Sequence, residues 1–225
     1  ISTTFGVFIQ DLPSSMATLR MMSGADSFLL TAIPFFVFAG ILMREGGITK
    51  RILDFATVLL GNFHGALGHV NIFASMVFGG ISGSSVADTA SIGSILIPEM
   101  IRKKYPRSVS AAVTAASSTI GIVIPPSIPM ILYAMASETS IGRLFLAGAI
   151  PGILVGLLMM LVTAYMSSRH GYGREREKMP SFKELLVGFK DGILALTMPL
   201  IIIGGIVGGV VTATEASALA VVYAS

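Results

Sequence analysis

Long apolar stretches alternate with short charged segments along this chain, and several stretches are long enough to cross a membrane. A transmembrane helix needs about 20 apolar residues. Such stretches cover Leu144–Met166 and Ile193–Val211, and a shorter one covers Phe28–Met43, where Pro34 predicts a kink. Only 12% of the residues are charged, whereas soluble domains carry about 25%. We therefore predict an all-α, polytopic transmembrane protein.

One uncharged segment, Ser108–Ser137, is interrupted by three prolines. Proline removes a backbone donor and clashes with the preceding turn of a helix. The segment therefore predicts two half-helices joined by an unwound piece at Gly121–Ser127. The alternative is one helix with a proline kink that neighbouring helices satisfy.

A polar island lies inside another apolar region, the residues 55–98, which contain no Lys, Arg or Glu. The island runs from Gly79 to Ser91 and holds the region's single acid, Asp88. Polar groups at membrane depth need internal partners, and an ionisable residue there indicates function. The alternatives are that the small residues pack helices together and that Asp88 caps a half-helix.

The basic residues gather in three clusters, which the positive-inside rule places in the cytoplasm. The first two clusters lie at 44–51 and 102–107, so the chain between them must return to the side from which it came. Val70–Phe78 and Ile92–Ile97 are each too short to span. We favour an amphipathic surface helix at Ile52–Leu60 followed by a re-entrant helical hairpin with its tip at Ser82–Ser91, near mid-membrane. Two full spans are the alternative.

The polar atoms at these two breaks suit a cation and a carboxylate. Hydroxyl and carbonyl oxygens with one carboxylate are hard ligands appropriate to Na⁺, and half-helix N-termini attract anions. The candidate Na⁺ ligands are Ser84, Ser85, Asp88, Gly121, Ile122, Val123, Ile124 and Pro125. The candidate substrate-binding residues are Ser82, Gly83, Ser118 and Ser127.

Four segments resemble the large membrane subunit of tripartite ATP-independent periplasmic (TRAP) transporters. The strongest are Gly79–Ala90 and Ser117–Ser127, and Pro34–Gly40 and Gly208–Ala216 also fit. The resemblance covers nearly the whole chain. In the last segment the family usually has Pro where this chain has Ala213, which weakens a role for the possible second-site residues Thr212, Thr214 and Glu215. From the residues alone, Thr212 or Thr214 is expected to cap a helix with Glu215 in its first turn.

The resemblance implies a sodium-coupled importer of small organic acids, such as sialic acid or C4-dicarboxylates, in the bacterial inner membrane. It implies an elevator-type movement and two inverted repeats, of which this chain would hold the first hairpin and the first broken helix. It also implies two partners, a periplasmic substrate-binding protein and a small membrane subunit that is separate or fused. No catalytic residue, organic cofactor or nucleic-acid partner is expected.

Together these patterns divide the chain into four regions. Residues 1–69 form a scaffold-type helix and an interfacial arm helix. Residues 70–137 form a transport-type region, with the hairpin at 70–101 and the broken helix at 108–137. Residues 138–192 form a transmembrane helix and a cytoplasmic loop, and residues 193–225 form a helix and the start of a second repeat. The first residue is not Met and the last residues are apolar, so we expect a piece of a longer protein, without a signal peptide at Ile1–Ile9.

Three other functions fit parts of the sequence less well. Another ion-coupled carboxylate carrier with hairpins, or a passive channel, shares most of the features above. Gly80–Gly83 matches the G-x-S-G of rhomboid intramembrane serine proteases, but His170 lies in a polar loop and His64 and His69 precede the serine, so no base is expected within reach.

Overall fold

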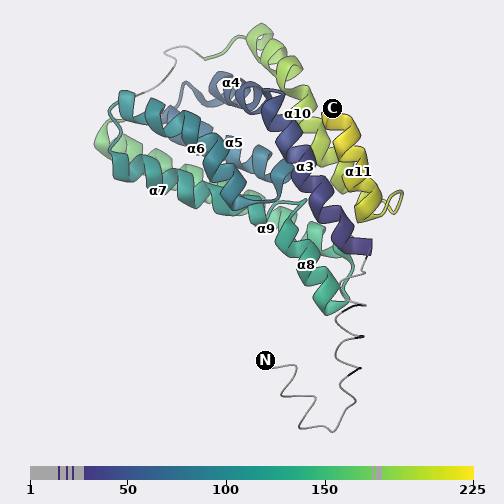
Figure 1. The fold of residues 1–225 in the computed structure, drawn as a ribbon. Helices are drawn as coiled ribbons and strands as arrows, with labels where there is room; N and C mark the ends of the chain where they lie inside the picture. Colours follow the sequence, from purple (N-terminus) through teal and green to yellow (C-terminus); the bar gives the residue numbers. More distant parts are fainter. Residues whose placement is uncertain (1–14, 16–18, 20–21, 23–27, 174, 176–178) are drawn as a thin grey trace, which may run out of the picture.

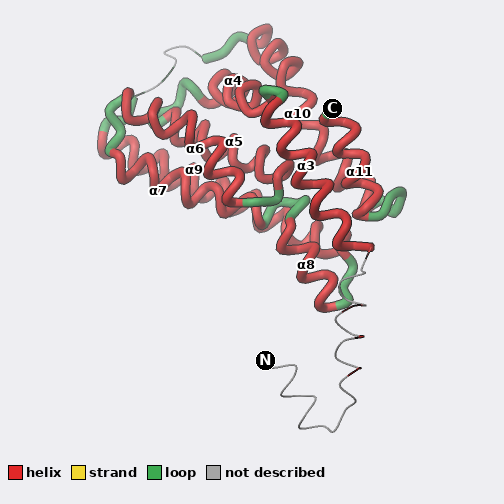
Figure 2. Tube along the Cα trace, viewed as in Figure 1, coloured by secondary structure: helices red, strands yellow, loops and turns green. Residues whose placement is uncertain are grey.

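The computed structural model describes residues 28–173, 175 and 179–225, together with the single residues 15, 19 and 22. All regular structure in this part is helical, which confirms the predicted class (Figure 2). The helices are α3 (Ala32–Glu45), α4 (Ile48–Leu60), α5 (Ala66–Ser82), α6 (Ser85–Arg102), α7 (Arg107–Ser118), α8 (Ile128–Ser137), α9 (Ile141–His170), α10 (Phe182–Val207) and α11 (Ala213–Ala224), with 3-10 turns η1 (Phe28–Thr31) and η2 (Thr119–Ile122).

The first two helices form a sharp corner. The α3 and α4 axes are bent by 69° across the turn at Gly46 and Gly47. Gly47 takes a φ of 74°, which a residue with a Cβ rarely adopts. A helix is present where the surface helix was predicted, but it begins at Ile48 rather than Ile52. Its position at the membrane surface stays a prediction. Pro34 lies in the first turn of α3, directly after η1, where the N–H that proline lacks has no acceptor within the α-helix. The kink predicted at this proline stays a prediction.

Helices α5 and α6 form a helical hairpin, as predicted, with a shorter tip than the sequence indicated. Only Gly83 and Ser84 separate the two helices, and the polar residues from 85 to 91 are helical. Gly83 has a φ of 60°, and its N–H donates to the Gly79 carbonyl oxygen at 2.8 Å. A left-handed glycine at this position ends α5 and reverses the chain.

The proline-rich segment is a broken helix, which confirms the second predicted interruption. Helix α7 passes into η2, residues 123–127 are unwound, and α8 begins at Ile128. The unwound piece is shorter than predicted, because η2 continues the helical path to Ile122. The peptide bond between Pro125 and Pro126 is cis.

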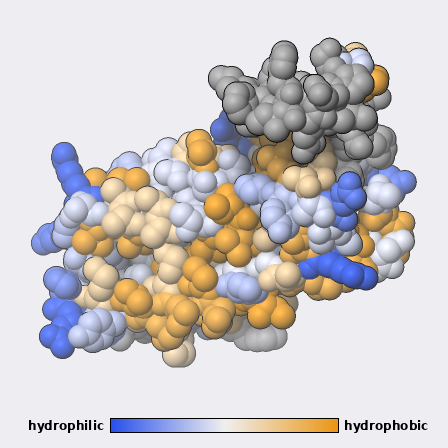
Figure 3. Space-filling model, turned by 90° about the horizontal axis from the view of Figure 1, so that it is seen from below, coloured by the Kyte–Doolittle hydropathy of each residue, from blue (hydrophilic) through white to orange (hydrophobic). Residues whose placement is uncertain are grey.

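Among the described residues, α9 is the single continuous helix long and apolar enough to cross a membrane, and each of two bent helix pairs would add a span. These pairs are α3 with α4 and the two halves of α10, which is bent by 62°. Figure 3 shows apolar side chains over much of one face of the molecule, with hydrophilic residues gathered near its edges. Such a surface fits lipid contact and not water alone.

Helix α5 is the centre of the molecule. It contacts α3, α4, α6, α7, α9, α10 and η2, and Val70, Ile72 and Phe78 are almost fully buried in it. Helix α11 lies along α3, and α10 lies along α4 (Figure 1). The hairpin and the broken helix are therefore held together from within the core.

Some sequence predictions fall outside the described residues. These are the predictions for Ile1–Ile9 and for Arg174, Arg176 and Lys178, which belong to the third basic cluster, at 169–190. The four predicted regions and their boundaries remain predictions.

Candidate functional site

The hairpin tip and the break between α7 and α8 are in backbone contact. A Cβ added to Gly79 would overlap the Cα of Gly121, and one added to Gly121 would lie 3.0 Å from the Cα of Gly79. The Ile128 N–H donates to the Gly83 carbonyl oxygen at 3.4 Å. Two glycines facing each other are what allow the hairpin and the break to approach this closely.

Two helix N-termini meet at this contact. Ser84 caps α6, where its hydroxyl accepts from the Ala87 N–H at 3.4 Å, and Ser127 caps α8 by accepting from the Met130 N–H at 3.4 Å. Each N-terminus carries a partial positive charge and unpaired N–H donors. The arrangement therefore favours an anion near the tip.

Asp88 lies one helical turn below the tip and is fully buried. Neither of its carboxylate oxygens receives a hydrogen bond. The hydroxyls of Ser75 and Ser118 lie beside this carboxylate, but their hydrogen bonds run elsewhere. The Ser75 hydroxyl donates to Ser117 Oγ at 3.1 Å, and the Ser118 hydroxyl donates to the Thr114 carbonyl oxygen at 2.8 Å. The cap of α6 is Ser84, so the interpretation of Asp88 as a helix cap is wrong.

A ladder of buried polar side chains joins α5 to α7 beside Asp88. Asn71 Nδ2 donates to Thr114 Oγ1 at 2.7 Å, and Asn71 Oδ1 accepts from Ser117 Oγ at 3.0 Å. Asn71, Ser75, Thr114 and Ser117 are all fully buried. Sequence reasoning did not single out this set. Its signal was the spacing of the polar residues, four positions apart on α5 (Asn71 and Ser75) and three apart on α7 (Thr114 and Ser117).

The backbone carbonyls of the break point in different directions. The Ile122 oxygen accepts from Ser127 Oγ at 2.7 Å. The Val123 oxygen faces Gly148 on α9, whereas a Cβ added to Gly80 would lie 3.3 Å from the Pro125 oxygen. Of these three carbonyls, Pro125 is the one directed at the hairpin.

The structure does not bring the residues predicted for substrate together at one point. Ser82 lines a cavity of about 110 Å³ between the tip and α3, together with the predicted Na⁺ ligand Ser84, and this cavity also reaches Arg44 and Ser91. Ser118 lies beside Asp88 instead, and Ser127 is buried where it caps α8. Gly83 packs its Cα against the Pro126–Ile128 backbone.

The possible second-site residues form a helix cap, as their spacing predicted. The Thr212 hydroxyl accepts from the Glu215 N–H at 3.3 Å, and a Glu215 carboxylate oxygen accepts from the Thr212 N–H at 2.7 Å. Thr214 is buried at the start of α11, which packs along α3. The structure therefore gives Thr212 and Glu215 a capping role at α11, whereas Thr214 lies in the first turn of the helix.

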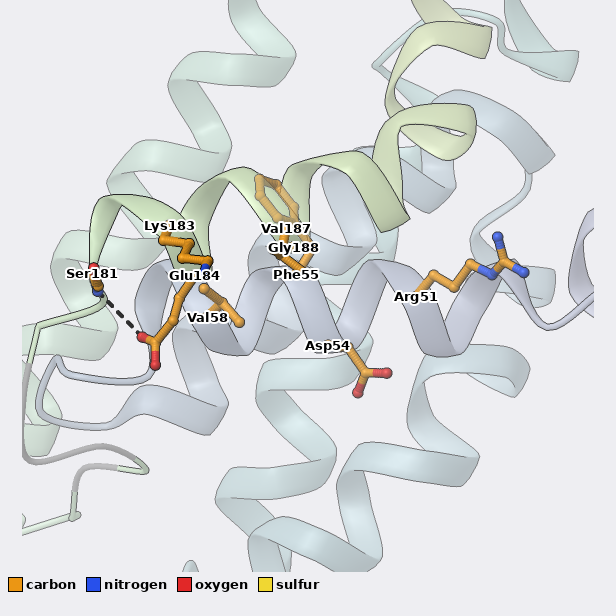
Figure 4. Close-up of a pocket in the computed structure, with 9 residues that line it drawn as sticks. All are labelled: Arg51, Asp54, Phe55, Val58, Ser181, Lys183, Glu184, Val187 and Gly188. Carbon is orange, nitrogen blue, oxygen red and sulfur yellow. Dashed lines mark hydrogen bonds between the residues drawn. The ribbon is translucent and has the colours of Figure 1, made fainter.

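A cavity of about 840 Å³ lies between α4 and the first half of α10, away from the tip (Figure 4). Phe55 points from α4 to α10 and packs on Gly188. Arg51 and Asp54 project from α4 away from Lys183 and Glu184, which lie on α10. The charged groups here do not converge on one point, unlike the polar atoms at the tip.

A helical hairpin and a broken helix that meet inside an apolar helical bundle are features typical of secondary transporters. The whole chain, residues 1–225, matches the family model described as the tripartite ATP-independent periplasmic transporter, DctM component. The chain belongs to this family and is an integral, multi-pass membrane protein.

Curated relatives agree with this assignment. The large permease protein SiaM of a sialic acid TRAP transporter from Vibrio cholerae is 42% identical over 226 residues, which is 100% of this chain and 52% of the relative. The C4-dicarboxylate permease DctM of Pseudomonas aeruginosa is 40% identical over 99% of this chain and 51% of its own length. The 2,3-diketo-L-gulonate permease YiaN of Escherichia coli is 43% identical over 91% of this chain and 48% of its own length. The chain thus spans about half the length of these relatives.

Proposed function

We propose that this chain is the first half of a sodium-coupled importer of small organic acids, and that Na⁺ binds between the hairpin and the break. The observation that carries the proposal is Asp88, a fully buried carboxylate whose oxygens receive no hydrogen bond. An uncompensated buried charge is costly, and a bound cation removes that cost. The Ser75 and Ser118 hydroxyls, whose protons are directed elsewhere, present lone pairs to the same cation.

The same region supplies the hard oxygen ligands that suit Na⁺. We assign Asp88, Ser75, Ser118 and the Pro125 carbonyl to the cation, and the hydroxyls of Ser84 and Ser85 remain candidates at the tip. The carbonyls of Gly121, Ile122, Val123 and Ile124 are the other candidates in the break. Of these four carbonyls, those of Ile122 and Val123 are the weaker candidate ligands, because their oxygens point at Ser127 and Gly148 instead.

The substrate is a small carboxylate that binds at the tip. Two capped helix N-termini and the Ser82 and Ser84 hydroxyls lie there, and all three named relatives above are described by an organic acid. The bound Na⁺ lowers the cost of bringing the carboxylate close to Asp88. When Na⁺ and the substrate are both bound, the hairpin and the broken helix can move. They move as one body, because the hydrogen-bonded polar side chains of α5 and α7 hold them together.

The partners follow from the family. We propose that a periplasmic binding protein delivers the substrate and that a small membrane subunit, separate or fused, completes the transporter in the inner membrane. Another ion-coupled carrier of similar fold would need neither partner.

The test is uptake by the full-length protein in liposomes, with its small subunit and binding protein present. A labelled organic acid is supplied with and without an inward Na⁺ gradient. Asp88→Asn should abolish the Na⁺ dependence, and Asp54→Asn, which changes an exposed acid on α4, should leave it intact. Unchanged Na⁺ dependence in Asp88→Asn would refute the cation assignment, and uptake that needs neither Na⁺ nor the binding protein would refute the function.

A further inference from the structure

A second cavity adjoins the tip on the side of the α3–α4 corner. It encloses about 400 Å³ and is lined by Arg44, Gly47, Thr49, Lys50, Ser91 and Ser94, among others. Arg44 and Ser91 also line the smaller cavity at the tip. The two cavities therefore share a wall, and together they lead from the hairpin tip toward the basic cluster at 44–51.

Two hydroxyls in this wall are buried without a hydrogen-bond partner. Thr49 is 4% exposed and Ser91 is 6% exposed, and neither hydroxyl oxygen has a partner. Buried hydroxyls are nearly always paired, so an orphaned pair in a cavity indicates a ligand or water that bonds them.

The start of α4 supplies further donors to the same cavity. Its N-cap is Gly47, which has no side chain to accept from the first N–H groups. The N-terminus of a helix of 13 residues thus presents unsatisfied N–H groups and a partial positive charge. Gly47, Thr49 and Lys50 of this turn all line the cavity.

Two cationic side chains, Arg44 and Lys50, also line this cavity. The Arg44 guanidinium is paired at 3.0 Å with Glu45, but both side chains are largely exposed, so the pair is weak and exchangeable. Hydroxyls, helix N–H groups and two cations converge here, and each of these groups recognises a carboxylate.

We infer that this cavity is the route by which a carboxylate substrate leaves the hairpin tip for the cytoplasm, with Arg44, Lys50, Thr49 and Ser91 as its transient binding groups. The inference rests on the proposed function for the identity of the substrate. It adds that the corner between α3 and α4, outside the hairpin and the break, takes part in substrate passage. A half-exposed, weakly paired arginine suits a transient contact because it holds the anion without trapping it.

The experiment measures the charge selectivity of the cavity directly. Ser94 is exposed on its wall, and this chain has no cysteine. Ser94→Cys is introduced into the full-length protein, in a background without other cysteines, and reacted from the cytoplasmic side with anionic and cationic methanethiosulfonates of similar size. Each rate is divided by the rate of that reagent with a free thiol in solution.

The anionic reagent should react faster than the cationic one. Adding Arg44→Gln and Lys50→Gln should lower the ratio of the two rates, on the order of fivefold for the loss of two nearby charges. Arg107→Gln removes an exposed cytoplasmic cation at the start of α7 and is the matched control, which should leave the ratio unchanged. Equal rates in Ser94→Cys, or a preference that survives both substitutions, would overturn the inference.

A second form of the experiment, in which added acids protect the cysteine from labelling, identifies the anion. Succinate or sialic acid at millimolar concentration should slow labelling by the anionic reagent in Ser94→Cys and lose that effect in Arg44→Gln. Protection by phosphatidylglycerol in the vesicles, without protection by either acid, would make the cavity a lipid headgroup site and overturn the route. Labelling needs no Na⁺ gradient, so it tests the proposed exit route separately from the uptake experiment, which tests sodium coupling.

Discussion

Asp88 shows how a single residue acquires its role from its surroundings and not from its position in a motif. At the fourth residue of α6 it lies too far into the helix to cap it, and Ser84 performs that task. Its carboxyl group is buried without a hydrogen bond to either oxygen, and an unpaired buried charge is costly, which is why we propose a cation there. The same argument explains why Ser75, which lies outside the motif at the tip, belongs to the proposed cation site.

Gly79 is the residue at which the hairpin depends most directly on the absence of a side chain. In Gly79→Ala the new methyl group would overlap the backbone of Gly121, which cannot rotate away as a side chain would. We expect a loss of about 1–3 kcal/mol in the free energy of unfolding, as in other overpacked cores, and loss of Na⁺-dependent uptake. Gly204→Ala is the matched control, because nothing lies within 4 Å of its added Cβ. Equal melting temperatures for the two variants in detergent would contradict the close contact.

At the scale of elements, the helices were predictable and their mutual contacts were not. The charge-free segments predicted the spans, the prolines predicted the break, and the polar island predicted the hairpin. These signals exist because an unpaired polar group is costly inside a membrane. The tip was predicted to cover the ten residues Ser82–Ser91, but only Gly83 and Ser84 lie between the helices, because Ser84 accepts a hydrogen bond from the Ala87 N–H and α6 begins directly after it. Asn71 was missed because its partners Thr114 and Ser117 are more than 40 residues away along the chain, so only the packed fold brings them together.

Asn71 is expected to fasten α5 to α7. Asn71→Leu removes its hydrogen bonds to Thr114 and Ser117 and leaves these two side chains with fewer partners. Hydrogen bonds between membrane helices contribute about 0.6 kcal/mol each, and at most about 1.7, so we expect a loss of about 1–3 kcal/mol in unfolding by a denaturing detergent. Ser168→Ala removes an exposed hydroxyl that bonds only within its own helix and should change nothing measurable.

Helix α11 is expected to depend on its cap. Thr212→Ala removes the hydroxyl that accepts from the Glu215 N–H, and losing an N-cap costs about 1 kcal/mol. Because α11 packs along α3, the loss should appear as a lower melting temperature of the whole protein. Thr89→Ala, which removes an exposed hydroxyl in the interior of α6, is the control. A larger effect of Thr89→Ala than of Thr212→Ala would contradict the capping role.

At the scale of the whole molecule, the proposals require one orientation in the membrane, and a chain without cysteines allows it to be measured. Helix α9 has 30 residues, a length of about 45 Å, so its ends must lie on opposite sides of a hydrocarbon core of about 30 Å. The positive-inside rule places Ser168 in the cytoplasm and Thr139 outside. Single cysteines at these two positions, introduced into a cysteine-free full-length protein, should react with an impermeant reagent from opposite sides.

A third position, Ser84→Cys at the tip, distinguishes a re-entrant hairpin from two full spans. Two full spans would bring this cysteine to the periplasmic surface, where it would react like Thr139→Cys. A re-entrant hairpin keeps it from the periplasmic reagent while the cavity beside Arg44 is open to the cytoplasm. Labelling of Ser84→Cys from outside as fast as Thr139→Cys would therefore refute the hairpin, and with it both the cation site and the route.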